Sequence, residues 1–364
     1  MLLLAAALAV VPPTPDWMGT LYNDRPDTRL TQVVIPGTHD SGAFKIDTEG
    51  KCKVTAIAGA NEAMVQAGLR NPCGVGKLSK AQSQNFTKQL NGGIRYLDMR
   101  LGVPADKVVT VKKAKKKLTN AAAAKVPIHL QHTFVSVRFT TGLKQIVKFA
   151  RAHPREQIIL DFQHIDLTGK KKIDKYYSSA IDKILRTYKT DGSTVCSRAW
   201  TASKIPDVTQ ATFRQAWDAG RNIVVLYAKG ELPKNSCYRA REQVLYSPWP
   251  NTEDPAVSQS ANVQSLTARQ QALAGTGSCT VAEGNQCGLF VDQLQLSMSL
   301  TSQIQCLTGA RTQNCSLQAL AQLRNPTAVQ EMTDWAAQGL PINISILDFY
   351  EIDDTAARLI ALND

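Results

Sequence analysis

The sequence predicts an α/β fold, a (β/α)8 barrel, on three observations. Apolar strand-like runs alternate with helix-like segments, which is typical of parallel βα units. There are eight such runs, the number that forms a barrel of this class. Polar and charged residues follow the ends of several runs, where such a barrel carries its chemistry. The runs cover residues 32–38, 94–101, 127–132, 157–163, 222–228, 243–247, 288–296 and 342–349.

The segments between the runs have helical periodicity. Leu143, Ile146 and Val147 share one helical face, and a second such face lies within residues 173–184. Two long segments, 41–93 and 248–287, interrupt the alternation. We interpret both as insertions over one face of the barrel.

The composition indicates a globular protein that binds anionic partners. The chain has 364 residues, of which 43% are hydrophobic and 20% charged, so it can bury a large core. Its net charge of +12 predicts attraction to anions, but does not choose between a lipid surface, nucleic acid and a phosphorylated small molecule. The lysines lack interleaved aromatic residues, which argues against a nucleic-acid module.

The N-terminus and the cysteines indicate export. Residues 2–11 form an apolar run like the core of a secretion signal, although an ordinary buried segment is the alternative. We assign residues 1–20 to a leader and linker, and residues 21–364 to one barrel domain. The cysteine count is even, at eight, and contains no CxxC pair, which favours disulfides over zinc. The expected pairs are Cys52/Cys73, Cys196/Cys237, Cys279/Cys287 and Cys306/Cys315.

A lysine-rich segment lies between the second and third runs. Residues 107–125 include Lys112-Lys113-Ala114-Lys115-Lys116-Lys117. One interpretation is a solvated loop with no further role. The other is a basic arm that meets an anionic membrane surface near the site.

One candidate site segment ends the first run, and another lies within the second run. Gly37-Thr38-His39-Asp40 ends the first run. In the second run, Asp98 and Arg100 are two residues apart and therefore face the same side of a strand. Charged residues inside a barrel are costly unless they are paired or functional. A structural ion pair is the alternative interpretation.

The third and last runs add a histidine and a carboxylate. His132 shares strand parity with the apolar residues Leu130 and Ile128, whereas His129 points the other way, so we select His132. His164 has the opposite parity to Asp161 and is a weaker candidate. Because the eighth strand of a closed barrel lies beside the first, Asp348 would neighbour His39 and raise its basicity. A helix-capping role for Asp348 is the alternative.

Four ordered motifs resemble the phosphatidylinositol-specific phospholipase C X-domain family. The resemblance extends over nearly the whole chain, and the first motif is the most specific. It implies a distorted TIM-type barrel that cleaves phosphodiesters of inositol lipids to diacylglycerol and inositol 1,2-cyclic phosphate. The motifs are Ile35-Pro36-Gly37-Thr38-His39-Asp40-Ser41-Gly42, Gly93-Ile94-Arg95-Tyr96-Leu97-Asp98-Met99-Arg100, Leu130-Gln131-His132-Thr133-Phe134 and Ile346-Leu347-Asp348-Phe349-Tyr350.

The resemblance also implies roles for the histidines and their carboxylates. His39 resembles the general base that deprotonates the inositol 2-hydroxyl, and Asp348 resembles the carboxylate behind it. His132 resembles the general acid that protonates the leaving glycerol oxygen. Asp98 would orient His132, and Asp40 would assist the acid or hold the neighbouring arginine.

Arg100 stands where calcium-dependent members of the family carry an acidic metal ligand. An arginine there resembles the metal-independent bacterial type, in which a guanidinium supplies the positive charge at the phosphate. The resemblance therefore implies no metal and no cofactor. The resemblance also implies that Gln163 and Tyr227 bind the substrate, but both depart from the family pattern, since other members carry charged residues that bind the inositol ring at these positions. The preferred head group is therefore open.

We therefore expect a secreted or surface phosphodiesterase that acts as a monomer on phospholipid head groups. One alternative is a metal-dependent enzyme for another phospholipid or a glycerophosphodiester. The other is an inactive barrel that binds membranes.

Overall fold

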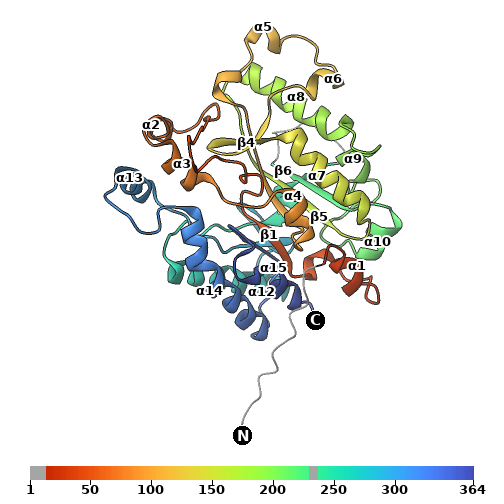
Figure 1. The fold of residues 1–364 in the computed structure, drawn as a ribbon. Helices are drawn as coiled ribbons and strands as arrows, with labels where there is room; N and C mark the ends of the chain where they lie inside the picture. The colour runs from red at the N-terminus through yellow and green to blue at the C-terminus, as the bar shows by residue number, and fades with distance from the viewer. Residues whose placement is uncertain (1–13, 229–236) are drawn as a thin grey trace.

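The computed structural model describes residues 14–228 and 237–364, which Figure 1 shows as a curled sheet with helices on its outer side. Eight of the ten strands of this sheet are parallel to one another and run in the order β7-β6-β5-β2-β1-β12-β11-β8. Their bounds are β1 Ile35–Thr38, β2 Tyr96–Gly102, β5 Ile158–Asp166, β6 Ile223–Tyr227, β7 Arg239–Ala240, β8 Leu245–Tyr246, β11 Leu289–Gln293 and β12 Ile344–Leu347.

This sheet is a distorted (β/α)8 barrel, so the predicted fold class is confirmed. β1 lies between β2 and β12, which brings the first and last strands of the chain together. The order ends at β7 and β8, which are not paired with each other in the described residues. The helix between them, α11 Arg241–Val244, has four residues, whereas parallel neighbours need a crossover of about a dozen. The barrel is therefore open at this point.

One of the eight predicted barrel strands is wrong. Residues 127–132 contain β3 His129–His132, which pairs antiparallel with β2 and turns into β4 Phe134–Arg138. The barrel neighbour of β2 is instead β5. An apolar run reveals an extended segment but not its direction. The eighth barrel strand is β7, whose two residues are too few to give a pattern.

Helices pack on the outer side of the sheet and over one end of it (Figure 1). The predicted faces of α7 and α8 are buried against it. The helices are α1 Trp17–Leu21, α2 Glu62–Arg70, α3 Pro72–Ser79, α4 Phe86–Asn91, α5 Val111–Ala114, α6 Asn120–Ala123, α7 Phe139–Ala152, α8 Lys171–Thr187, α9 Val195–Arg198, α10 Phe213–Asp218, α12 Pro255–Leu273, α13 Leu300–Thr308, α14 Leu317–Ala337 and α15 Thr355–Ala361. A short hairpin, β9 Thr280–Val281 and β10 Gly284–Asn285, lies apart from the barrel sheet.

The barrel interior is apolar where the strands are closest together. Ile159, Val291 and Ile344 belong to one buried cluster there. Gly37 in β1 has no room for a side chain, because an added Cβ would lie 2.8 Å from Ile346 and 3.0 Å from Tyr96. This close approach explains the glycine in the first motif.

The four expected disulfides are confirmed. They join Cys52 to Cys73, Cys196 to Cys237, Cys279 to Cys287 and Cys306 to Cys315. The first lies in the 41–93 insertion with α2, α3 and α4, and the third lies in the 248–287 insertion.

The N-terminal boundary differs from the predicted one. Residues 1–13, most of the expected leader and linker, lie outside the described residues. α1 falls inside the assigned range, yet Trp17 and Met18 are buried, and the Trp17 indole donates a hydrogen bond to the carbonyl of Gly93. This part of the range therefore packs with the barrel. In the described parts of the chain, no helix has the length and apolarity needed to span a membrane.

Candidate active site

His39, at the end of β1, contacts the carboxylate at the end of β12. Its Nδ1 lies 2.8 Å from Oδ1 of Asp348, because β1 and β12 pair in register up to Thr38 and Leu347. His39 and Asp348 are therefore neighbours, as predicted. Since a carboxylate only accepts, the neutral imidazole carries its proton on Nδ1 and leaves the Nε2 lone pair facing the site.

The residue directly after each of His39, His132 and Asp348 has a left-handed backbone conformation. These residues, Asp40, Thr133 and Phe349, have φ values of 43°, 62° and 44°. Non-glycine residues rarely adopt this conformation, which costs free energy. The turns are held by side chains, since Asp98 accepts from the N–H of Asp40. The chain thus turns sharply where each functional side chain leaves it.

Arg100 lies at the centre of a charged cluster. Its Nε is 2.5 Å from Oδ1 of Asp40, and its Nη2 is 3.3 Å from Oδ2 of Asp98 and 2.9 Å from Nε2 of His39. Both carboxylates are fully buried, and only 18% of the arginine side chain is exposed. The strand parity that placed Asp98 and Arg100 on one side is consistent with this contact. A buried guanidinium held this way presents a fixed positive charge.

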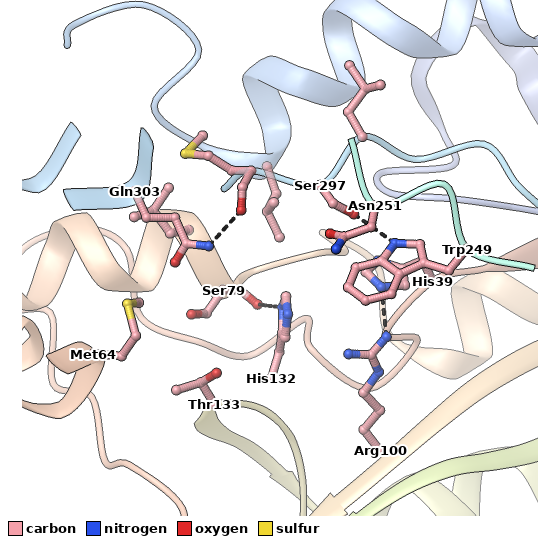
Figure 2. Close-up of a pocket in the computed structure, with 14 residues that line it drawn as sticks. His39, Met64, Ser79, Arg100, His132, Thr133, Trp249, Asn251, Ser297 and Gln303 are labelled. Atoms are coloured by element: carbon pink, nitrogen blue, oxygen red, sulfur yellow. Dashed lines mark hydrogen bonds between the residues drawn. The ribbon is translucent and has the colours of Figure 1, made fainter. Parts of the chain in front are cut away.

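His132 faces His39 across the cluster, as Figure 2 shows. The two rings are 5.9 Å apart and nearly perpendicular. Nδ1 of His132 lies 3.1 Å from the carbonyl oxygen of Ser79, and Nε2 lies 3.3 Å from Oδ2 of Asp40. His129 lies elsewhere, with Nδ1 3.3 Å from the carbonyl oxygen of Pro127. The choice of His132 over His129 thus agrees with the geometry.

The expected contact between Asp98 and His132 is not present. Asp98 instead contacts Arg100 and the N–H of Asp40, and the carboxylate beside His132 is Asp40. The reason is that β3 pairs antiparallel with β2 and is not the next parallel strand of the barrel. His132 therefore does not stand beside Asp98. Asp40 has both contacts suggested for it, to the acid candidate and to the arginine.

The two histidines have opposite pKa shifts. Burial disfavours the imidazolium of His39, but the charges of Asp40 and Asp348 outweigh burial and raise its pKa. Burial lowers the pKa of His132 to about 3, and the positive charges of Arg100 and His39 add to this effect. The unliganded site therefore favours a proton on His39. A bound phosphate anion would oppose the lowering at His132.

Two pockets meet at Arg100 and His132. The first, here the apolar pocket, has a cavity volume of about 200 Å³ and is also lined by His39. Its apolar lining is Met64, Leu78, Trp249, Leu296, Met298 and Leu317 (Figure 2). The second, here the polar recess, has a volume of about 270 Å³ and is lined in part by Asn61, Gln131 and Asp166. The charged cluster thus lies between an apolar and a polar wall.

Neither residue expected to bind substrate lies in these pockets. The ring of Tyr227 is 3% exposed, packs in a core cluster against Phe162 and Tyr238, and lines neither pocket. Gln163 is half-buried in β5 and lines neither the apolar pocket nor the polar recess. Both assignments came from the family resemblance, by matching positions along the fourth and fifth predicted strands.

A bulge in β5 changes which residue lies opposite Arg100, so that His164 and not Gln163 takes this position. Asp98 pairs with Asp161, but Arg100 pairs with His164, so β5 has one extra residue between the two pairs. His164 is exposed, yet it lies close enough to Asp40 and Asp98 to affect their pKa values. Strand parity predicted that His164 faces away from the site, and no feature of the sequence indicates the bulge.

Arg241 is a further, largely buried charge, and no pattern in the sequence marks it. Its Nε lies 2.9 Å and 3.0 Å from the two carboxyl oxygens of Asp161, one of which also accepts from the hydroxyl of Tyr96 at 2.5 Å. Asp161 is fully buried and is the register partner of Asp98. A second buried ion pair therefore lies inside the barrel beside the first.

Three site residues are close enough together to be considered as metal ligands. His39, Asp40 and Asp98 each offer a ligand atom, and these atoms lie within 4.8 Å of one another. However, the guanidinium of Arg100 contacts all three side chains. A cation in this position would meet that charge, so the residues do not fit a metal site while Arg100 keeps its place.

Comparisons with known proteins give relatives over nearly the whole chain. No family model matches it. It is 23% identical over 351 residues to human PI-PLC X domain-containing protein 3, which covers 96% of this chain and 93% of that protein. It is 24% identical over 359 residues to mouse PI-PLC X domain-containing protein 2, with coverage of 96% and 87%.

Solved bacterial structures have the same fold. A phosphatidylinositol-specific phospholipase C from Staphylococcus aureus aligns with a TM-score of 0.56 and 15% identity, covering 98% of this chain and 99% of that one. The enzyme from Listeria monocytogenes aligns with a TM-score of 0.53 and 18% identity, covering 97% and 99%. At these identities the alignments establish the fold alone.

Proposed function

Because the homologues of this chain are PI-PLC X domain-containing proteins, we propose that it is a phospholipase C-type phosphodiesterase. The proposed substrate is an inositol phospholipid or a glycosylphosphatidylinositol. The products are diacylglycerol and inositol 1,2-cyclic phosphate. The observation that carries this proposal is the pair of imidazoles around a guanidinium, with an apolar pocket on one side and a polar recess on the other.

In the proposed reaction the two histidines move protons in opposite directions. Nε2 of His39 takes the proton of the inositol 2-hydroxyl, and that oxygen forms a bond to phosphorus. The bond from phosphorus to the glycerol oxygen breaks, and His132 donates a proton to that oxygen. Asp348 stabilises the proton-bearing form of His39, and Asp40 does the same for His132.

Arg100 stabilises the negative charge that develops on the phosphoryl oxygens. Its guanidinium is fixed by Asp40 and Asp98 before substrate binds, so little reorganisation is needed. We propose that this charge replaces a divalent cation and that the enzyme needs neither metal nor cofactor.

The proposed setting is outside the cell. Four disulfides form in oxidising compartments, which is consistent with a secreted or surface protein. We propose a monomer whose partners are the phospholipid head group and an anionic membrane surface, with no nucleic acid.

Phosphorus NMR of the water-soluble product, with phosphatidylinositol and excess chelator, tests this function. We expect a cyclic phosphate signal from the wild-type protein. His39→Ala and His132→Ala should each reduce its rate by roughly 10²–10⁴-fold, the range for loss of a general acid or base. His129→Ala is the matched control and should retain most activity.

Two results would favour the alternatives. Activity that disappears with chelator and returns with calcium would favour a metal-dependent enzyme at His39, Asp40 and Asp98. Binding to liposomes with no turnover, unchanged in His39→Ala, would favour an inactive membrane-binding barrel.

A further inference from the structure

We infer that the lysine-rich arm and the start of α8 form one surface that docks the protein on an anionic lipid bilayer. We call this surface the lysine patch. The inference rests on the proposed function, because a lipid substrate lies in a membrane, but it is tested separately. The lysine patch consists of Lys107, Lys112, Lys113, Lys115, Lys116, Lys117, Lys125, Lys170, Lys171, Lys172 and Lys175.

The arm is folded onto the barrel and is not a loose tail. α5 and α6 pack beside α8 (Figure 1). Val109 and Ala123 of the arm, and Val126 directly after it, are buried in the core cluster that also contains Tyr177 of α8. The N–H of Val109 donates to the hydroxyl of Tyr177 at 2.9 Å. The apolar side chains of the arm thus hold it in place while its lysines remain exposed.

The charge of the lysine patch is almost uncompensated. Residues 106–125 and 170–175 contain eleven lysines and two aspartates, a formal charge of +9 out of +12 for the whole chain. In the described residues, the one ion pair of a patch lysine is between Lys107 and Asp106. Oδ1 of Asp174 accepts hydrogen bonds from the N–H and the hydroxyl of Thr168, and no ion pair joins Asp174 to a lysine among the residues that the structure describes. Such a charge density attracts an anionic surface.

The position of the lysine patch favours a membrane. The arm follows β2, which carries Arg100, and α8 follows β5, whose last residue Asp166 lines the polar recess. Both lysine-bearing segments therefore leave the strands at the end that holds the site. Val111, at the start of α5, is 45% exposed among the lysines. A small apolar tip within a basic surface fits the head-group region of a bilayer better than it fits a polar polyanion.

Sedimentation with lipid vesicles tests this inference. The probes are phosphatidylcholine vesicles with and without phosphatidylserine. The arm variant carries Lys112→Gln, Lys113→Gln, Lys115→Gln, Lys116→Gln and Lys117→Gln. The control variant loses the same charge at five exposed lysines elsewhere, through Lys88→Gln, Lys144→Gln, Lys148→Gln, Lys189→Gln and Lys204→Gln.

The wild-type protein should bind the phosphatidylserine vesicles, and added salt should weaken that binding. Each lysine near an anionic surface contributes on the order of a fivefold change in binding. The arm variant should therefore bind at least about tenfold more weakly, and the control variant should bind nearly as well as wild type. Replacing the same five arm lysines by arginine should preserve binding, and all variants should keep the wild-type circular dichroism melting curve.

Several results would overturn the inference. One is equal weakening in the arm and control variants. Another is binding that does not depend on phosphatidylserine. A third is an arm variant that loses binding to heparin or nucleic acid but not to vesicles, which would assign the lysine patch to a polyanion.

The experiment also separates this inference from the proposed function. Hydrolysis of a water-soluble, short-chain substrate should be the same in the arm variant and wild type. Hydrolysis of phosphatidylinositol in anionic vesicles should fall in the arm variant. If the protein sediments through its arm but hydrolyses neither substrate, the docking inference stands and the proposed function fails.

Discussion

At the scale of single residues, the site is organised by charge. Arg100 contacts two buried carboxylates and a histidine, and Asp40 lies between Arg100 and both imidazoles. Burial makes each of these charges expensive unless its partner is present. Removing one member therefore changes the protonation of the others, and the pKa of His39 is the most accessible readout.

Asp348→Asn should move the pH dependence of kcat/KM. The proposed base is the neutral form of His39, which is present above its raised pKa, so activity falls as the pH drops through that pKa. Without the Asp348 charge the pKa of His39 falls, so the acidic limb of the pH profile moves to lower pH. The maximal rate should also fall, because a less basic imidazole is a weaker general base.

The matched control for this experiment is Asp16→Asn. Asp16 pairs with His153 at 2.7 Å, in a histidine–carboxylate pair away from the site. Its removal should leave the pH profile unchanged. A profile that is the same in Asp348→Asn and wild type would contradict His39 as the base.

At the scale of secondary-structure elements, a buried amide joins the two strands that carry His39 and Asp348. Nε2 of Gln82 donates to the carbonyl oxygens of His39 and Leu347, at 2.8 Å and 3.0 Å. The side chain is fully buried. Gln82 therefore fixes the ends of β1 and β12 relative to each other at the site.

Gln82→Leu should impair both stability and catalysis. It leaves two buried carbonyl groups without this donor, at a cost of about 1–3 kcal/mol in the free energy of unfolding. It should lower kcat more than it raises KM, because the site residues shift while the pockets keep their lining. Chemical denaturation and steady-state kinetics measure the two effects.

Gln66→Leu is the control for this element. Gln66 is exposed on α2 and donates to Glu62. Its loss should change stability and kcat little. An unchanged kcat in Gln82→Leu would exclude a positioning role for that amide.

At the scale of the whole molecule, one buried carboxyl links stability to pH. Asp292 in β11 is fully buried, and neither of its carboxyl oxygens has a hydrogen-bond partner in the described residues. Burial raises its pKa from 3.8 to about 8, although Arg269 opposes the shift. The folded protein therefore keeps a proton on Asp292 that the unfolded chain has already released.

Asp292→Asn should flatten the pH dependence of stability. Between about pH 4 and pH 8 the folded state binds more protons than the unfolded state, so the wild-type free energy of unfolding decreases as the pH rises. The stabilising contribution is complete below the unfolded pKa and is lost through the folded pKa. Each pKa unit corresponds to about 1.4 kcal/mol, so the total change is on the order of a few kcal/mol.

Urea denaturation at pH 5.5 and pH 8 measures this effect. The difference between the two pH values should be smaller in Asp292→Asn than in wild type. Asp218→Asn, at an exposed position, is the control and should behave as wild type. An equal pH dependence in all three proteins would contradict a proton held on Asp292.

Features that depend on local pattern and composition follow from the amino-acid order alone. Apolar runs with polar ends predicted seven of the barrel strands. Two cysteine pairs that bracket short loops, with the remaining four cysteines paired in turn, predicted the disulfides that the structure confirms. Strand parity also placed Asp98 and Arg100 on one side, because side chains alternate along any extended segment.

Features that depend on strand direction and register became clear from the folded chain. β3 turned out antiparallel, a bulge in β5 brought His164 opposite Arg100, and Tyr227 packed into the core. Arg241 reached Asp161 from a short helix that no periodic pattern marks. The physical reason is that hydrogen-bond pairing between distant segments fixes which face a residue occupies, and one extra residue reverses that face.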